Sequence, residues 1–237
     1  MSTTPSGTQI ALLGTGTPRP DPERSGSATV IVVDGRPYLF DFGPGVVRRA
    51  AAAYLKGVHA IGPAAQHLRT IFLTHLHADH TAGYPDLILT PWILGRDGPV
   101  DVFGPPGLLD MTAHVLAAWK VDIENRLHGI DRLPKLGCTI TAHEFEAGIA
   151  YRDSRITVTA FPVRHAGLAH AFGFRIETPH KTIVLSGDTA PTPALAQHCQ
   201  GCDVLIHEAL LGSNIPARES KMAGLPPWQS YIVDRAR

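Results

Sequence analysis

A stretch of seven residues, Thr-His-Leu-His-Ala-Asp-His at positions 74–80, constrains the fold of this chain more than any other. It directly follows an apolar run at 68–73, whose short length and β-branched content predict a buried strand. Alternate side chains share a face on an extended backbone, so His75 and His77 would point together from the end of that strand. The pattern therefore predicts that these two imidazoles reach one metal ion.

The second half of the stretch is expected to face another way. Asp79 is well placed to start a helix predicted over 82–94, so Asp79 and His80 would project toward a second ion. Zinc favours such a set of nitrogen and oxygen ligands. The alternative is a polar surface loop that happens to be rich in histidine, but a strand-to-helix turn gives the pattern a geometric role.

Composition limits the classes of protein that fit. The 237 residues are long enough for one large domain or two small ones, and 44% apolar and 18% charged residues are typical of a soluble globular protein. Lys+Arg and Asp+Glu both number 21, so bulk charge offers no attraction to nucleic acid or to an anionic membrane. No apolar stretch is long enough to span a bilayer and no signal peptide is evident, which predicts a cytoplasmic location.

The cysteines fit a reducing compartment, because three of them cannot form a disulfide framework. Cys199 and Cys202, with His198 beside them, could form a redox pair or half of a zinc site. A zinc site needs further ligands and no second pair exists in the sequence. We therefore favour an incidental loop at the end of a helix.

Other polar residues also stand at the ends of predicted strands. Asp41 ends one of them, where it could orient a metal-binding loop or simply cap a turn, and both interpretations stay open. His165 and Asp188 each follow a strand, and Asp188 lies at the tip of a Ser-Gly-Asp-Thr loop. The predicted strands are 9–13, 28–33, 37–42, 100–103, 156–163, 182–185 and 204–206, and further helices are predicted over 46–56 and 108–121.

Several motifs together resemble a known superfamily. The His-x-His-x-Asp-His pattern is similar to that of the metallo-β-lactamase-fold hydrolases, and other stretches resemble their ribonuclease Z-like branch. These stretches, in the family's order within residues 8–212, are Leu-Leu-Gly-Thr-Gly at 12–16, Leu-Phe-Asp-Phe-Gly at 39–43, Ser-Gly-Asp-Thr at 186–189 and His-Glu-Ala at 207–209. The resemblance implies an αββα four-layer sandwich, formed by a single domain over 1–237 that lacks the family's C-terminal βα segment.

The same resemblance implies a ligand set and a chemistry. Two zinc ions per chain are expected, with Mn²⁺ or Fe²⁺ as alternatives, and a water between them would become a hydroxide that attacks the substrate. The second site would be one protein ligand short, because the family's last histidine would lie beyond residue 237. The expected ligands are His75, His77 and His165 for site one and Asp79, His80 and bridging Asp188 for site two.

Asp79 and Glu208 are the predicted catalytic residues. Glu208 belongs to a segment that resembles the His-Glu-Ala-Thr motif of ribonuclease Z, with Leu210 in place of the threonine. By that resemblance, Glu208 would assist departure of the leaving group.

Two departures from the family's pattern favour a small substrate. Ribonuclease Z enzymes carry Pro-x-Lys-x-Arg-Asn where this chain has Pro-Asp-Pro-Glu-Arg-Ser at 20–25, and the Gly/Pro/Lys-rich arm that grips tRNA is not found. We therefore predict a metal-dependent hydrolase of a small phosphodiester or ester, with a lactone or carboxylic ester as the rival substrate. Nucleic acid is predicted to be an unlikely partner, and a homodimer is the expected assembly if the chain associates.

Two hypotheses from other classes remain. A non-catalytic metal-binding or scaffold protein is suggested by the missing last ligand. Related di-iron redox proteins usually carry a glutamate where His77 stands, which disfavours the redox class.

Overall fold

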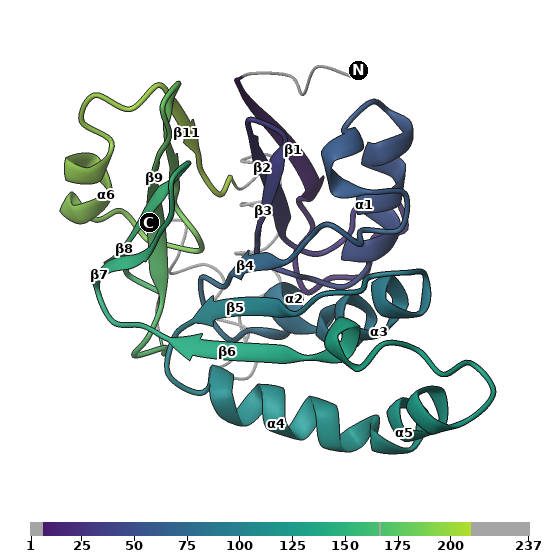
Figure 1. The fold of residues 1–237 in the computed structure, drawn as a ribbon. Helices are drawn as coiled ribbons and strands as arrows, with labels where there is room; N and C mark the ends of the chain where they lie inside the picture. The colour runs from purple at the N-terminus through teal and green to yellow at the C-terminus, as the bar shows by residue number, and fades with distance from the viewer. Residues whose placement is uncertain (1–6, 166, 210–237) are drawn as a thin grey trace.

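Two β-sheets pack face to face, with helices on the outer side of each, in the computed structural model of the protein (Figure 1). The model describes residues 7–165 and 167–209. Within them, the first sheet has the order β1-β2-β3-β4-β5-β6 and the second has the order β11-β10-β9-β8-β7. The arrangement is the αββα sandwich that the sequence predicts.

The first sheet combines antiparallel and parallel strands. β1 to β3 form an antiparallel meander, and β3 to β6 run parallel to one another. The turn between β2 and β3 uses Asp34 and Gly35, both with positive φ (46° and 78°), as expected for a tight hairpin. The strands are β1 (Thr8–Gly14), β2 (Ala28–Val33), β3 (Arg36–Phe40), β4 (Thr70–Phe72), β5 (Val100–Gly104) and β6 (Ile140–Glu144).

The second sheet is antiparallel except for its last pair, β10 and β11, which run parallel. Its strands are β7 (Gly148–Arg152), β8 (Thr157–Pro162), β9 (Phe172–Glu177), β10 (Thr182–Leu185) and β11 (Val204–Ile206). The helices are α1 (Val46–Leu55), α2 (Ala78–Thr81), α3 (Tyr84–Ile93), α4 (Leu108–Ala118), α5 (Lys120–His128) and α6 (Pro193–His198), with 3₁₀ turns η1 (His59–Ile61) and η2 (Lys135–Cys138).

Successive side chains along a strand pack into different layers of the hydrophobic core. In β3, Leu39 packs with the helices that cover the first sheet, whereas Tyr38 and Phe40 face the second sheet. β10 behaves likewise, with Ile183 between the sheets and Val184 against α6. Because successive side chains point to opposite faces, a strand buried on both sides is almost entirely apolar, as is β2, in which Thr29 is the one polar residue.

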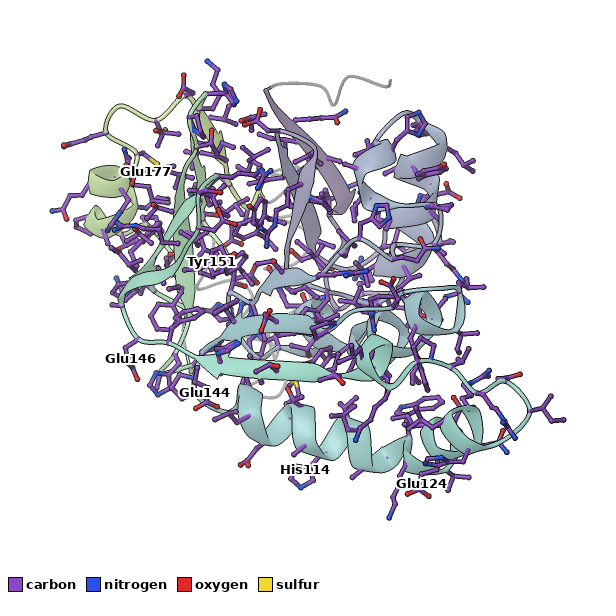
Figure 2. The ribbon with its side chains drawn as sticks, in the orientation of Figure 1. His114, Glu124, Glu144, Glu146, Tyr151 and Glu177 are labelled. Carbon is purple, nitrogen blue, oxygen red and sulfur yellow. The ribbon has the colours of Figure 1, made fainter. Side chains whose placement is uncertain are left out.

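Aromatic rings fill the layer between the sheets. Phe72 is fully buried and stacks on Phe40 and Phe103, with ring centroids 4.9 and 5.4 Å away. Across the layer its ring meets Phe174 at 6.1 Å and Tyr151, which is labelled in Figure 2, at 5.5 Å. This cluster fixes β4, and with it the residues that follow, against the second sheet.

Several predicted boundaries are wrong for identifiable reasons. The helix predicted over 82–94 is α3, which begins at Tyr84, and a separate short helix, α2, precedes it. Gly83 lies between the two, where a Cβ would lie 2.4 Å from the carbonyl oxygen of Gly43. The helix predicted over 108–121 ends at Ala118, and α5 follows it. The predicted strand 37–42 ends at Phe40.

The sequence analysis also missed β6, β7, β9 and α6. β6 and β7 have no fully buried residue, so their apolar alternation is weak. Tertiary contacts support them: Glu144, at the end of β6, accepts hydrogen bonds from the backbone N–H groups of Gly107 and Leu109 at the start of α4 (Figure 2). Cys199 caps the end of α6, in line with the predicted helix-end loop.

No helix within the described residues is both long enough and apolar enough to cross a membrane.

Replacing the ring of Phe72 should destabilise the whole sandwich. We expect Phe72→Ala to lower the free energy of unfolding by about 3–5 kcal/mol, because it leaves a cavity among buried rings. Urea unfolding followed by circular dichroism measures this, with Leu55→Ala as the control, since Leu55 is 83% exposed. A loss below about 1 kcal/mol for Phe72→Ala would contradict the packing described here.

Candidate metal centre

Three imidazole nitrogens converge at the edge where the two sheets meet. Nδ1 of His77 lies 3.1 Å from Nε2 of His75 and 2.9 Å from Nε2 of His165. His75 and His77 follow β4 in the first sheet, and His165 follows β8 in the second. His75 and His165 are buried, and His77 is half-buried.

The spacing of these nitrogens suits a tetrahedral ion. With bonds of about 2.0–2.1 Å, two nitrogen ligands of zinc are about 3.3 Å apart, close to the separations found here. The sequence prediction placed these three histidines on one ion, and the structure brings their nitrogen atoms together.

A second group of potential ligands shares His75 and adds His80 and Asp188. Nε2 of His80 lies 3.4 Å from Oδ1 of Asp188 and 3.7 Å from Oδ2 of Asp79. All three residues predicted for the second ion therefore lie together. Sequence reasoning did not anticipate that His75 would adjoin both groups.

Asp41 holds the histidine stretch in place from the end of β3. It is buried, and its carboxylate accepts hydrogen bonds from the backbone N–H of Thr74 and from Nδ1 of His80, both at 2.8 Å. The Thr74 hydroxyl lies 3.0 Å from both carboxylate oxygens and 3.0 Å from Nδ1 of His75. Of the two interpretations of Asp41, the structure supports the one in which it orients the site.

These contacts fix which ring nitrogen of each histidine faces the centre. The network is satisfied when Nδ1–H of His80 donates to Asp41, Nδ1–H of His75 donates to Thr74, and the Thr74 hydroxyl donates to Asp41. When both rings are neutral, as metal ligands are, Nε2 of each ring carries the lone pair. Thr74 is a supporting residue that sequence reasoning missed, although it directly precedes His75.

Burial and neighbouring charges give His75 and His80 very different pKa values. Burial, with the adjacent His80 cation adding to it, lowers the pKa of His75 to about 2, so His75 is neutral, as a metal ligand must be. Burial also opposes charge on His80, but Asp41 and Asp188 outweigh it and raise its pKa to about 10. A cation is thus favoured between these two carboxylates.

Asp79 does not start a helix as predicted. His77 is the N-cap of α2, and Asp79 lies within the first turn of that helix. Its carbonyl oxygen accepts from the backbone N–H of Ser27, and a Cβ at Gly43 would lie 2.2 Å from that oxygen. Glycine at 43 therefore lets α2 approach the end of β3 closely.

Asp188 sits in a loop that is tied down on both sides. Gly187 has a φ of 59°, and a Cβ there would lie 2.6 Å from the carbonyl oxygen of Phe172. The carboxylate of Glu208 accepts a hydrogen bond from the backbone N–H of Thr189, and the N–H of Glu208 donates to Ser186 Oγ at 3.1 Å. Glu208 belongs to neither group of potential metal ligands found among the described residues. Leu210 and the residues after it lie outside those described, so the predicted lack of a C-terminal βα segment stays a prediction.

The sequence of this chain is similar to those of known proteins. The model of the β-lactamase superfamily domain matches residues 36–225. The chain is 37% identical over 206 residues to a ribonuclease Z of Mycobacterium bovis, covering 85% of this chain and 70% of that protein. It is 35% identical over 221 residues to one of Mycobacterium marinum, covering 90% and 75%.

Solved structures share the fold. Human tRNase Z, short form, superposes with a TM-score of 0.67 at 24% identity, covering 89% of this chain and 82% of that one. A long form ribonuclease Z from yeast gives 0.63 at 19% identity, covering 93% and 35%.

The fold and the site define a metallo-β-lactamase-fold hydrolase, a class whose fold implies a divalent metal. Within that superfamily, the chain belongs to the ribonuclease Z-like branch.

The predicted small-molecule substrate, with nucleic acid an unlikely partner, is wrong. The relatives at 35–37% identity are ribonucleases by name. The prediction failed because net charge is a sum over the whole chain and does not report how charge is distributed near a site. The altered loop at 20–25 did not exclude this branch either.

Removing one charge from Asp41 should loosen metal binding without removing a ligand. We expect Asp41→Asn to weaken zinc affinity by about 10–100-fold, because an amide cannot accept from both Thr74 and His80 as the carboxylate does. Competition with a chelating dye measures the affinity. The control is Asp101→Asn, which alters a partly exposed carboxylate that also pairs with a histidine, His143. Equal affinities for both variants would contradict the orienting role.

Proposed function

We propose that this chain is a metal-dependent phosphodiesterase that cleaves tRNA. The observation that carries the proposal is the convergence of His75, His77 and His165 in a chain 37% identical to a ribonuclease Z. The donor chemistry supports it, since neutral imidazoles and carboxylates suit zinc. A cytoplasmic location and a single domain over 1–237 stay predictions.

The proposed ligands divide between two zinc ions. His75, His77 and His165 would hold the first, and Asp79, His80 and Asp188 would hold the second, with Asp188 shared. The contacts of His80 with Asp79 and Asp188 support this division. Mn²⁺ and Fe²⁺ are alternatives that the same donors accept.

Bound divalent cations would supply Lewis acidity toward the phosphate and a nucleophile drawn from water. The chain's own residues prepare the site for them. Asp41 and Thr74 aim Nε2 of His75 and His80 at the centre, and burial keeps His75 unprotonated. Ligands held in this way need little reorganisation during the reaction.

Glu208 supports the site through the backbone in this structure. Its carboxylate accepts from Thr189, the residue after Asp188, so it fixes the loop that carries the proposed bridging ligand. The predicted role of Glu208 in leaving-group departure stays a prediction, as does a catalytic role for Asp79.

The proposed activity can be tested directly. We expect the zinc-loaded protein to cleave a labelled tRNA precursor with a 3′ extension, and His77→Ala to lower kcat/KM about a hundredfold or more, because one of three converging ligands is lost. The control is His114→Ala, which alters an exposed histidine on the outer side of α4 (Figure 2). A zinc-loaded wild type that cleaves no RNA, but hydrolyses lactones or carboxylic esters, would contradict the proposal.

Metal content separates the enzyme from a scaffold. We expect elemental analysis to give about two zinc ions per wild-type chain, and Asp188→Asn to lower the affinity for both, because a shared ligand is weakened. The His114→Ala protein again serves as the control. Zero or one ion per wild-type chain, with no turnover, would instead favour the non-catalytic class.

A further inference from the structure

Two cysteines stand at the end of α6, on the outer side of the second sheet (Figure 1). Cys199 caps the helix, Cys202 follows three residues later, and both are partly exposed. Their side chains pack against a small core cluster formed by Phe161, Val184 and Leu195. The pair belongs to neither group of potential metal ligands found among the described residues. It is therefore available for chemistry of its own.

A tight turn brings the two cysteines together. The backbone N–H of Cys202 donates to the carbonyl oxygen of Cys199 at 3.0 Å. Gly201 has a φ of 67°, which a turn of this kind requires and which glycine adopts without strain. A four-residue turn holds its first and last Cα atoms within about 7 Å, and disulfides join Cα atoms about 4.4–6.8 Å apart. The backbone thus already has the spacing that a disulfide needs.

Contacts with the second sheet fix this turn on both sides. Nη1 of Arg175, from β9, donates to the carbonyl oxygen of His198 at 2.5 Å and to that of Gln200 at 3.2 Å. After the turn, the backbone N–H of Asp203 donates to the carbonyl oxygen of Thr182 at 2.8 Å. Because the flanking residues are held in this way, the two sulfur atoms can bond without a rearrangement of the sheet.

The protonation of the pair indicates which kind of redox chemistry fits. Burial raises the pKa of the Cys199 thiol, and the neighbouring Cys202 thiol raises it further. Redox catalysts instead use a cysteine whose pKa is lowered, because the thiolate is the reactive form. A protonated pair reacts slowly, and its disulfide is not weakened by a stabilised thiolate. These properties suit a disulfide that responds to redox conditions rather than one that turns over.

The pair also borders the metal centre. Cys199 lines a cavity of about 430 Å³ together with Thr189 and Glu208. Thr189 directly follows Asp188, and Glu208 accepts the hydrogen bond that holds that loop. A change at the end of α6 is therefore felt in the wall of a cavity that the loop of the proposed bridging ligand also lines.

We propose that Cys199 and Cys202 are a redox-responsive site, which forms a reversible intrachain disulfide by exchange with a low-molecular-weight disulfide. One thiolate attacks a sulfur of the small disulfide and releases its other half as a thiol. The second cysteine then attacks the mixed disulfide and releases the remaining half. The protein loses two electrons and two protons, and the small disulfide gains them as two thiols. The inference goes beyond the proposed function and does not require it.

The test follows the two thiols in a Cys138→Ser parent, which retains Cys199 and Cys202 as its only cysteines. The zinc-loaded full chain is equilibrated with mixtures of reduced and oxidised glutathione. Free thiols are then trapped with iodoacetamide, and the intact mass is measured. We expect one intrachain disulfide, without bound glutathione, that an excess of reduced glutathione reverses.

Gly201 offers matched variants that keep both cysteines. For Gly201→Val, half-oxidation should require about a tenfold higher ratio of oxidised glutathione to the square of reduced glutathione, because a β-branched residue disfavours the positive φ of the turn. Gly201→Asn should stay close to the parent, since asparagine tolerates that conformation. Circular dichroism checks that both variants fold.

Several results would overturn the site. Thiols that stay alkylated at every ratio, that retain glutathione, or that link two chains on a non-reducing gel would each do so. Equal midpoints for Gly201→Val and the parent would show that the turn does not prepare the pair. Protection of the reduced thiols by added zinc, lost on chelation, would make them metal ligands instead. None of these measurements involves RNA, so the proposed function is tested separately.

Discussion

The candidate site depends on one buried carboxylate, that of Asp41. It stands at the end of β3 with a φ of 61°, a strained conformation for a residue other than glycine. From there it accepts hydrogen bonds from Thr74 and His80, which belong to the segment after the neighbouring strand β4. A buried charge is costly without partners, and here the backbone and side chains of the histidine stretch supply them. The same bonds that satisfy Asp41 orient the imidazoles.

The sheets bring the rest of the ligands to the same place. β3 and β4 are parallel, so their carboxyl ends meet at one edge of the first sheet, and the loops after β8 and β10 reach that edge from the second sheet. The backbone N–H of Phe172 donates to the carbonyl oxygen of Thr74, which joins the two sheets directly beside the site. Glycines at 43 and 187 allow two close backbone approaches beside the site. The aromatic layer around Phe72 keeps the sheets in register beneath the site.

The overall charge of the chain says little about its substrate. The chain as a whole is electrically neutral, with 21 basic and 21 acidic residues. That balance does not decide between a nucleic acid and a small molecule, whereas the relatives are ribonucleases by name.

Much of the fold was predictable, because the apolar strands of both sheets have strong patterns. β2, β4 and β10 were predicted because they are buried on both faces, and a short apolar run is visible without any partner. β6 and β7 were missed because their residues are partly exposed and gain their regularity from pairing with β5 and β8. The separate short helix α2 was not predicted, and the close approach of Gly83 to Gly43 beside it joins segments far apart in the sequence.

By itself, the sequence determined the chemistry of the centre. Residues 74–80 supply imidazoles and a carboxylate at a strand end, and the strand-end positions of His165 and Asp188 indicate further ligands. Only the tertiary structure decided how those donors meet: which nitrogen of each ring faces inward, that His75 adjoins both groups, and that Glu208 holds the Asp188 loop. The physical reason is that donor type is a local property of each side chain. Orientation depends on hydrogen bonds between segments 33 and 39 residues apart, such as those that Asp41 accepts from Thr74 and His80, and only folding brings those segments together.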